Sequence, residues 1–332
     1  MTFYVMASTY ATPRHKCLLI INPISGTGKK RGVAARCMRK LSREGIDVEV
    51  LYTEKAGDAS TFAAHAAAKG YLGVIAAGGD GTVNEIATSL RGTGTALGII
   101  PLGSGNGLAR HLGLSMDTSE AIDVIARRNI VACDSCSVND RTFVCTFGLG
   151  FDAAVSEKFA KSQHRGLLNY IKSAISEYQR FEPTEYEISA DGHTFRFKAS
   201  IVAACNASQY GNNIFIAPHA SIKDGLVDIT IIHADTPLTQ ARVGVELITG
   251  LVKNNMIIQT LRVKEATIRR PEEGIAHVDG EPITLGAELN IRCNHGDLLM
   301  FTTGNKKPFR PLITPFTLLY REIRNRLLAL KH

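Results

Sequence analysis

Short apolar runs alternate with helix-length segments through the first third of this 332-residue chain. The runs at 17–21, 46–53, 72–77 and 95–102 are predicted strands, and the segments between them have helical features. Strands that alternate with helices form a doubly wound parallel sheet, whose ligands bind at the carboxyl ends of the strands. The pattern therefore predicts an α/β domain over residues 14–135.

Strand-like segments dominate the second half of the chain. They are predicted at 141–147, 186–189, 194–203, 227–233, 261–268 and 289–293, with helical insertions around 166–181 and 238–251. This pattern predicts a second, mainly β domain over residues 136–305. The last apolar segment, 315–330, is predicted to be a helix that docks back on the first domain, and a basic helix on a membrane surface is the alternative.

A glycine-rich turn joins the third predicted strand to its helix. It consists of Gly78, Gly79, Asp80, Gly81 and Thr82. Glycines let a backbone approach a polyphosphate, and the N–H groups that begin a helix attract negative charge. A carboxylate in such a turn would repel phosphate unless a divalent cation bridged them, so Asp80 is a candidate magnesium ligand. As a lone motif, the turn would more often be a glycine-lined bend that has no ligand.

Polar or glycine residues also follow the other predicted strands, at 22–28, at Thr53 and at 103–107. Their spacing fits neither a P-loop nor the G-x-G-x-x-G dinucleotide fingerprint. One crevice at the carboxyl edge of the sheet could collect all of these segments.

Composition is that of a globular protein, with 45% hydrophobic and 21% charged residues. A net charge of +7 favours anionic partners. No aromatic and basic interleaving points to nucleic acid, which we exclude as a partner. Seven cysteines, an odd number, suit reduced thiols, and the N-terminus lacks the order of a signal peptide. These features predict a cytoplasmic protein.

Two of the Asp-Gly pairs in the second domain are candidate functional turns. Asp279 and Gly280 lie between two short apolar runs and predict a hairpin. The other pair follows Ser221 in 221–226, where a tight turn could present oxygen ligands to a hard cation or be a plain turn. His277, beside the hairpin, is a further candidate, although most single histidines are structural.

Four separated blocks, 22–26, 78–85, 101–106 and 278–281, together resemble the diacylglycerol kinase catalytic domain family, which includes bacterial soluble lipid kinases and sphingosine kinases. The resemblance covers roughly residues 16–303. It implies that the first domain is NAD kinase-like and binds ATP, that the mainly β domain is a β sandwich that holds the acceptor, and that phosphoryl transfer occurs between them. The nucleotide contacts that it implies are Asn22, Pro23, Ser25, Gly26, Thr53, Gly78, Gly79, Gly81, Thr82, Val83, Asn84, Glu85, Gly103, Ser104 and Asn106.

The resemblance also implies the catalytic groups. Asp80 matches the carboxylate that holds the catalytic Mg²⁺, and Asp134 aligns with a second aspartate of that magnesium network. Many relatives have an aspartate where this chain has Gly107, so the network here is expected to lack one carboxylate. The general base is expected in the 279–281 block, with Glu281 ranked above Asp279.

A structural Mg²⁺ is implied at the second Asp-Gly turn. In bacterial relatives, one carboxylate and two backbone carbonyls bind it, and these match Asp224, Ser221 and Leu226.

The predicted function is that of an ATP-dependent lipid kinase with Mg²⁺, acting on a lipid hydroxyl, with diacylglycerol the preferred acceptor and a sphingoid base or another lipid alcohol the alternative. An NAD kinase-like enzyme with a soluble acceptor and an inactive nucleotide- or lipid-binding regulator are further alternatives. The predicted partners are a lipid substrate and an anionic membrane surface, which would place the protein peripherally at the inner face of the membrane. A homodimer is left open.

Overall fold

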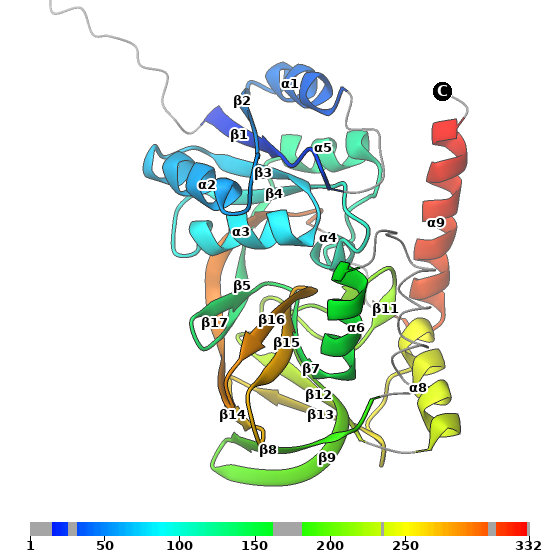
Figure 1. Ribbon diagram of the computed structural model, residues 1–332. Helices are drawn as coiled ribbons and strands as arrows, with labels where there is room; N and C mark the ends of the chain where they lie inside the picture. Colours follow the sequence, from blue (N-terminus) through cyan, green and yellow to red (C-terminus); the bar gives the residue numbers. More distant parts are fainter. Residues whose placement is uncertain (1–14, 26–31, 162–180, 234–235, 305–309, 331–332) are drawn as a thin grey trace, which may run out of the picture.

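The chain forms two stacked parts, an α/β domain and a β-rich domain, with the C-terminal helix alongside (Figure 1). The computed structural model describes residues 15–25, 32–161, 181–233, 236–304 and 310–330. Most of the predicted helix at 166–181 lies outside these residues.

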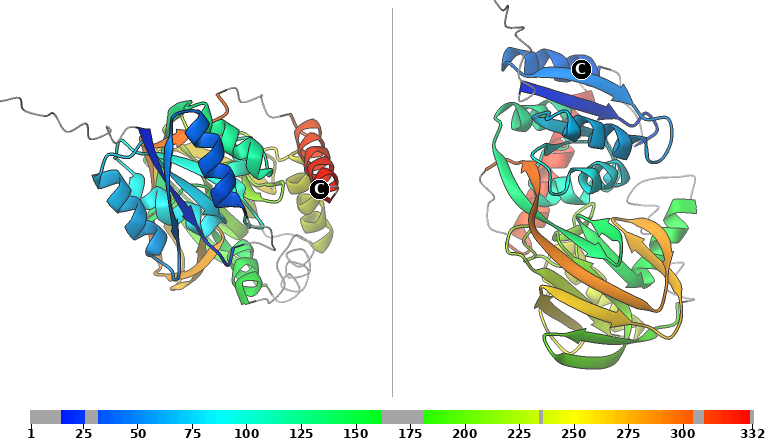
Figure 2. Two further views of the ribbon diagram at one scale, coloured as in Figure 1. Left: turned by 90° about the horizontal axis from the view of Figure 1, so that it is seen from above. Right: turned by 90° about the vertical axis from the view of Figure 1, so that its left-hand side faces the viewer.

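The α/β domain has a parallel sheet with the strand order β4-β3-β1-β2. Its strands are β1 (Lys16–Ile21), β2 (Asp47–Tyr52), β3 (Gly73–Gly78) and β4 (Ala96–Pro101). Figure 2 shows helices on both faces of this sheet. The helices α2 (Asp58–Ala68) and α3 (Asp80–Leu90) contact each other on one face, and α1 (Val33–Arg43) and α5 (Thr118–Ala126) on the other.

Alternating side chains of the central strands explain the two helical layers. Leu18 and Ile20 of β1 pack into a core with α2 and α3. Their neighbours Leu19 and Ile21 pack into a second core with α1 and α5. Strands that are apolar on both faces belong to the middle of a three-layer α/β structure. The predicted doubly wound α/β domain is therefore confirmed.

The second part is mainly antiparallel. Its strands are β5 (Ile130–Val138), β6 (Arg141–Phe143), β7 (Thr146–Gly150), β8 (Thr184–Ala190), β9 (His193–Cys205), β10 (Gln209–Gly211), β11 (Ile214–Phe215), β12 (Val227–His233), β13 (Ile258–Val263), β14 (Glu265–Arg269), β15 (Gly274–Val278), β16 (Glu281–Leu285) and β17 (Glu288–Phe301). Among the described residues, the helices α6 (Phe151–Lys161) and α8 (Pro237–Thr249) accompany them, whereas the short helix α4 (Gly107–His111) follows β4 and packs into the core of the first domain. The predicted β-rich domain is confirmed, as is the helix around 238–251.

The strand predicted at 141–147 was wrong as a single element, because the chain forms β6 and β7 instead. The N–H groups of Val144, Cys145 and Thr146 donate to the carboxylate of Asp279. A backbone that satisfies its donors with a side chain leaves the strand ladder at that point. The predicted strand 261–268 likewise divides, at Lys264, into β13 and β14.

Two long strands, β5 and β17, link the domains. The first residues of β17 pair with β14 of the β-rich domain, and Met300 near its end pairs with Leu97 of β4. β5 runs antiparallel to β17 along most of this length, with an irregularity between Asn294 and Leu298. One hydrogen-bonded sheet therefore continues through both parts of the molecule.

The C-terminal helix α9 (Ile313–Leu330) lies along the side of the molecule above α8 (Figure 1). The N–H of Leu312 donates to the carbonyl of Thr249 at the end of α8, at 2.8 Å. Arg321 forms an ion pair with Glu120 of α5 at 3.1 Å. Among the described residues, no helix is long and apolar enough to span a bilayer.

Candidate active site

The carboxyl ends of β1, β3 and β4 lie close together because these strands are parallel neighbours. A Cβ added to Gly103 after β4 would lie 2.5 Å from the Cα of Gly79 after β3. Asn22 after β1 donates from its side chain to the Thr82 hydroxyl at 3.1 Å. Three loops that are distant in sequence therefore form one surface around the start of α3.

Asp80 is the first residue of α3, and its carboxylate is fixed by the neighbouring loop. It accepts the N–H groups of Asn106 and Gly107, each at 2.8 Å. Burial, with a smaller contribution from the charge of Asp279, raises the pKa of Asp80 to about 6, against the opposing effect of the two N–H donors. The carboxylate is held in place, and its ionised form is short of compensating positive charge.

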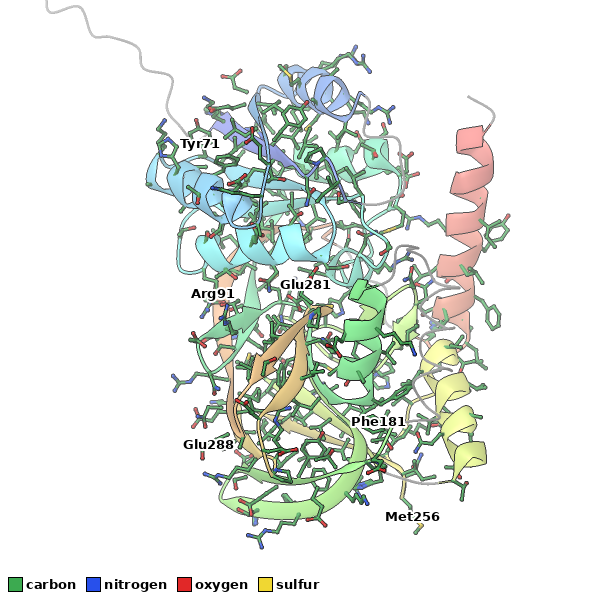
Figure 3. All side chains as sticks on the ribbon, in the orientation of Figure 1. Tyr71, Arg91, Phe181, Met256, Glu281 and Glu288 are labelled. Carbon is green, nitrogen blue, oxygen red and sulfur yellow. The ribbon has the colours of Figure 1, made fainter. Side chains whose placement is uncertain are left out.

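The hairpin of β15 and β16 extends from the β-rich domain to this surface. Glu281 begins β16, and its Oε1 lies 3.2 Å from the position that a Cβ on Gly81 would occupy. Figure 3 shows Glu281 at the junction between the two domains, beneath α3. An exposed carboxylate of the second domain therefore lies against the glycine turn of the first.

Glu281 lines a cleft of about 760 Å³ between the domains. The wall formed by the first domain includes several of the predicted nucleotide contacts, Asn22, Pro23, Thr53, Gly81, Thr82, Asn84 and Glu85. Lys55 and Arg141 are the basic residues among its described lining. A cleft of this size can hold a small-molecule ligand.

Asp279 is buried at the turn of the same hairpin, and its carboxylate is saturated with donors. Its Oδ1 accepts the N–H groups of Cys145 and Thr146, at 2.8 and 2.9 Å. Its Oδ2 accepts the N–H of Val144 at 3.0 Å and the Asn84 amide of α3 at 2.8 Å. Burial raises the pKa of Asp279, against the effect of these donors. The contact with Asn84 ties the hairpin to the helix that begins with Asp80.

The remaining predicted nucleotide residues support the loops around the cleft. Asn106 has a left-handed backbone, and its side chain bonds both the N–H and the carbonyl of Gly103. Glu85 of α3 accepts the N–H of Gly57 at the start of α2. Ser25 donates its hydroxyl to the carbonyl of Asn22. Gly26 lies outside the described residues.

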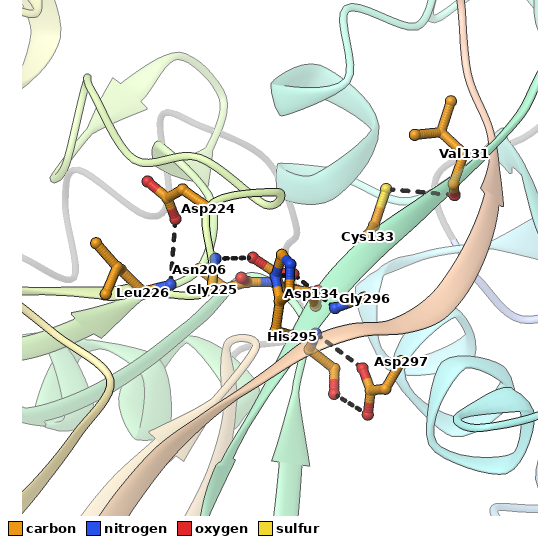
Figure 4. A network of polar contacts seen from close by, with 11 residues as sticks. Val131, Cys133, Asp134, Asn206, Asp224, Gly225, Leu226, His295, Gly296 and Asp297 are labelled. Atoms are coloured by element: carbon orange, nitrogen blue, oxygen red, sulfur yellow. Dashed lines mark hydrogen bonds and ion pairs between the residues drawn. The ribbon is translucent and has the colours of Figure 1, made fainter.

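Asp134 lies at a different place, beside the predicted second metal turn (Figure 4). Its carboxylate accepts the N–H groups of Gly225 and Gly296 and contacts Nδ1 of His295, each at 2.8 Å. None of these partners belongs to the Asp80 loop. The prediction that Asp134 joins the magnesium network of Asp80 has no supporting contact among the described residues.

Asp224 is directed back onto its own turn, where Oδ1 accepts the N–H of Leu226 at 3.2 Å. Its Oδ2 lies 3.8 Å from the guanidinium of Arg262. The described residues contain no cluster of three or more His, Cys, Asp or Glu side chains suited to a metal. A cation at this turn would therefore depend on backbone oxygens besides Asp224, as the sequence predicts for Ser221 and Leu226.

Sequence reasoning singled out His277 and missed its partners. His277 is buried and lies 3.2 Å from the carboxylate of buried Asp152, to which Tyr210 donates its hydroxyl at 2.7 Å. The three residues are more than 50 positions apart from one another in sequence, so no local motif could have joined them.

Two family models match this chain. Residues 16–138 match the diacylglycerol kinase catalytic domain, and residues 145–298 match the YegS C-terminal NAD kinase beta sandwich-like domain. A "diacylglycerol kinase" of Mycobacterium tuberculosis is 29% identical over 80% of this chain and 88% of its own length. A "probable lipid kinase YegS-like" of Klebsiella pneumoniae is 30% identical over 80% of this chain and 89% of its own length.

The fold agrees with these matches. A crystal structure of a diacylglycerol kinase from Bacillus anthracis superposes with a TM-score of 0.71, covering 87% of this chain and 97% of that one, at 22% identity. The two-domain architecture and the matches along most of the chain define the class. The chain belongs to the diacylglycerol kinase family of lipid kinases.

Proposed function

We propose that this protein transfers the γ-phosphate of ATP to a lipid hydroxyl, with diacylglycerol as the acceptor and phosphatidic acid as the product. The observation that carries the proposal is the position of Glu281 against Gly81. Phosphoryl transfer needs a nucleotide held in line with its acceptor and a group that takes the proton of the incoming hydroxyl. The two domains bring these requirements to one cleft.

Glu281 is the proposed general base. Its side chain is exposed in the cleft, where an acceptor hydroxyl can reach it. Asp279 has four donors on its carboxylate, so it is less available to accept a substrate proton. We assign Asp279 the task of holding the hairpin against α3 through Asn84.

A magnesium ion is the proposed cofactor of the ATP site, with Asp80 as its protein ligand. Asp80 has a raised pKa, and the charge of the Asp279 carboxylate contributes to it. The two carboxylates form an anionic site, which a bound cation would stabilise. Mg²⁺ in such sites is commonly bound by one or two carboxylates together with water and substrate phosphates, which fits the residues present. When bound, the ion would neutralise charge on the phosphate oxygens.

A second, structural Mg²⁺ is proposed at Ser221, Asp224 and Leu226. Asp134 supports this turn, because it accepts the N–H of Gly225. The nearby guanidinium of Arg262 would share the Asp224 carboxylate with the ion.

We further propose that the protein works peripherally at the inner face of the membrane. Apolar side chains of α9 are exposed at helical spacing, including Phe316 and Tyr320, which are 62% and 69% exposed. Val245 and Ile248 are exposed on the contacting helix α8. Apolar groups accompanied by basic residues such as Arg324 suit an anionic lipid surface.

Product analysis tests the function. The protein is incubated with γ-labelled ATP, Mg²⁺, a mixed lipid extract and NAD, and the labelled products are separated. Label in phosphatidic acid is expected. Label in a sphingoid-base phosphate would change the acceptor, label in NADP would indicate the soluble reaction, and no labelled product would contradict a kinase.

A further inference from the structure

A buried polar cluster lies directly behind the hairpin that carries Glu281. Asp152 of α6 is 3% exposed, and His277 of β15 is 1% exposed. Oδ2 of Asp152 accepts the hydroxyl of Tyr210 at 2.7 Å and contacts Nε2 of His277 at 3.2 Å. Oδ1 accepts the N–H of Ala153 at 2.8 Å. The proposed phosphoryl transfer gives none of these groups a task.

The hydrogen-bond directions connect this cluster to the hairpin turn. The N–H of Gly280 donates to Nδ1 of His277 at 3.3 Å. Because Nδ1 accepts this bond, the imidazole proton is assigned to Nε2, which then donates to Asp152. The cluster thus bonds the main chain of the residue immediately before Glu281.

The residues packed around the cluster leave no space for the His277 ring to move. Gly148 of β7 pairs with His277, and a Cβ there would lie 2.1 Å from Oδ2 of Asp152 and 2.4 Å from Nε2 of His277. The Tyr210 ring packs edge-on against the His277 ring, with centroids 5.7 Å apart and an interplanar angle of 69°. The position of the imidazole is therefore fixed on several sides.

The other end of the cluster reaches the loop that holds Asp80. The carbonyl of Tyr210 lies 3.1 Å from the position that a Cβ on Gly107 would occupy. The N–H of Asn212 donates to the carbonyl of Gly105 at 3.3 Å. The N–H of Gly107 in turn donates to Asp80. A continuous series of contacts joins the nucleotide side of the cleft to the turn before Glu281.

We propose that Tyr210, Asp152 and His277 are positioning residues that hold Glu281 at a fixed place relative to the nucleotide loop. This inference rests on the proposed function, since it requires that Glu281 be the base. A displacement of about 1 Å in a reacting group can reduce a rate about 100-fold. Loss of one contact in the cluster should therefore reduce kcat while leaving the KM for ATP nearly unchanged, because none of the three residues lines the described cleft.

Two substitutions of His277 separate positioning from mere packing. The amide of His277→Gln can place a donor near the former Nε2 but offers no acceptor to Gly280. The side-chain oxygen of His277→Asn can replace Nδ1 as that acceptor but does not reach Asp152. If the bond to the turn sets the position of Glu281, kcat should fall about tenfold in the Gln variant and clearly less in the Asn variant. Equal values of kcat in the two variants, or a lower value in the Asn variant, would overturn the proposal.

Tyr210→Phe tests the far end of the cluster, and Tyr71→Phe is its matched control. Each change removes a tyrosine hydroxyl that donates to a carboxylate at 2.7 Å, in the control to Glu49 at the edge of the first domain. We expect similar losses in Tm but a fall of about fivefold in kcat for Tyr210→Phe alone. A fall in kcat that is the same in both variants would assign Tyr210 to stability only.

Glu281→Gln, assayed in parallel, shows which hypothesis fails. If Glu281→Gln retains full activity, the proposed function of Glu281 is wrong. If Glu281→Gln is inactive while the Tyr210 and His277 variants equal the wild type, the positioning role alone is wrong. The double variant of Glu281→Gln with His277→Gln should lose no more activity than Glu281→Gln, since His277 acts through Glu281.

Discussion

At the scale of residues, Asp279 and Glu281 lie two positions apart on one hairpin and have different surroundings. Asp279 is 8% exposed and has four donors, whereas Glu281 is exposed in the cleft. A carboxylate that accepts many fixed donors stabilises the local fold, and one with free lone pairs can accept a proton. Sequence spacing could not distinguish the surroundings of these two carboxylates, because the backbone donors to Asp279 come from residues more than 130 positions away.

Asp279→Asn should destabilise the protein. The asparagine side chain has one acceptor oxygen, and its NH₂ group would point at backbone N–H groups, which are donors as well. These unpaired donors should lower the free energy of unfolding by about 2 kcal/mol. Urea denaturation should show this loss in the free energy of unfolding. Asp191→Asn is the control, since Asp191 has the same left-handed φ of 49° before a glycine but is exposed. Equal, small effects in both variants would contradict the structural assignment of Asp279.

Asp80 gives the protein a predictable pH dependence. Its pKa is raised from 3.8 to about 6, so the folded state retains this proton when the unfolded state has lost it. Stability that depends on Asp80 should therefore fall as the pH rises from about 4 to about 6. The free energy of unfolding of the wild type relative to Asp80→Asn should decrease by up to about 3 kcal/mol over this range. A constant or increasing difference in denaturation experiments would refute the assigned pKa shift.

At the scale of elements, the glycine loops after β3 and β4 depend on close backbone contact. Gly103→Ala would place a Cβ 2.5 Å from the Cα of Gly79, which cannot rotate away. We expect a loss of about 1–3 kcal/mol in stability and a higher KM for ATP. Gly94→Ala, in the turn before β4, has no atom within 4 Å of the new Cβ and should be nearly neutral. Calorimetry measures the change in stability, and kinetics at varied ATP concentration measure the change in KM. A Gly103→Ala variant with unchanged stability and KM would show that the close contact with Gly79 is not required.

The exposed face of α9 makes a separate prediction. Replacing Phe316 and Tyr320 together by serine should lower the affinity for anionic phospholipid vesicles about tenfold or more, because two aromatic side chains that contact the bilayer are lost. Sedimentation with the vesicles measures this affinity. Phe195→Ser is the control, since Phe195 is 47% exposed on the distant strand β9. Unchanged vesicle binding with loss of a dimer would instead assign this face to a second copy of the chain.

Sequence patterns predicted the elements of the first domain well, because the strands β1, β3 and β4 are buried on both faces and each ends in a glycine or polar loop. The loops at 78–82 and 103–107 were expected to meet, and Gly79 and Gly103 do so. The β-rich domain was predicted less exactly. The strands there change partner where a side chain takes the backbone donors, as Asp279 does between β6 and β7, and periodicity does not report such long-range contacts.

At the scale of the whole molecule, the two domains are joined by a continuous sheet and by side-chain contacts between the domains. Arg91, which directly follows α3, forms an ion pair with Asp297 of β17 at 2.7 Å, and its guanidinium donates to the Thr142 hydroxyl. Together with the contact of Asn84 with Asp279, these bonds fix the second domain relative to α3. The cleft therefore has Glu281 of the second domain on one side and Asn22 and Thr53 of the first domain on the other.

The most direct measurement is the transfer of label from γ-labelled ATP to diacylglycerol by the wild type and by Glu281→Gln, with ATP binding followed in parallel. Our account predicts labelled phosphatidic acid from the wild type, a decrease in kcat of about 100-fold or more for Glu281→Gln, and unchanged ATP affinity. A Glu281→Gln enzyme that phosphorylates diacylglycerol at the wild-type rate would contradict the claim that a carboxylate of the second domain activates the acceptor across the cleft.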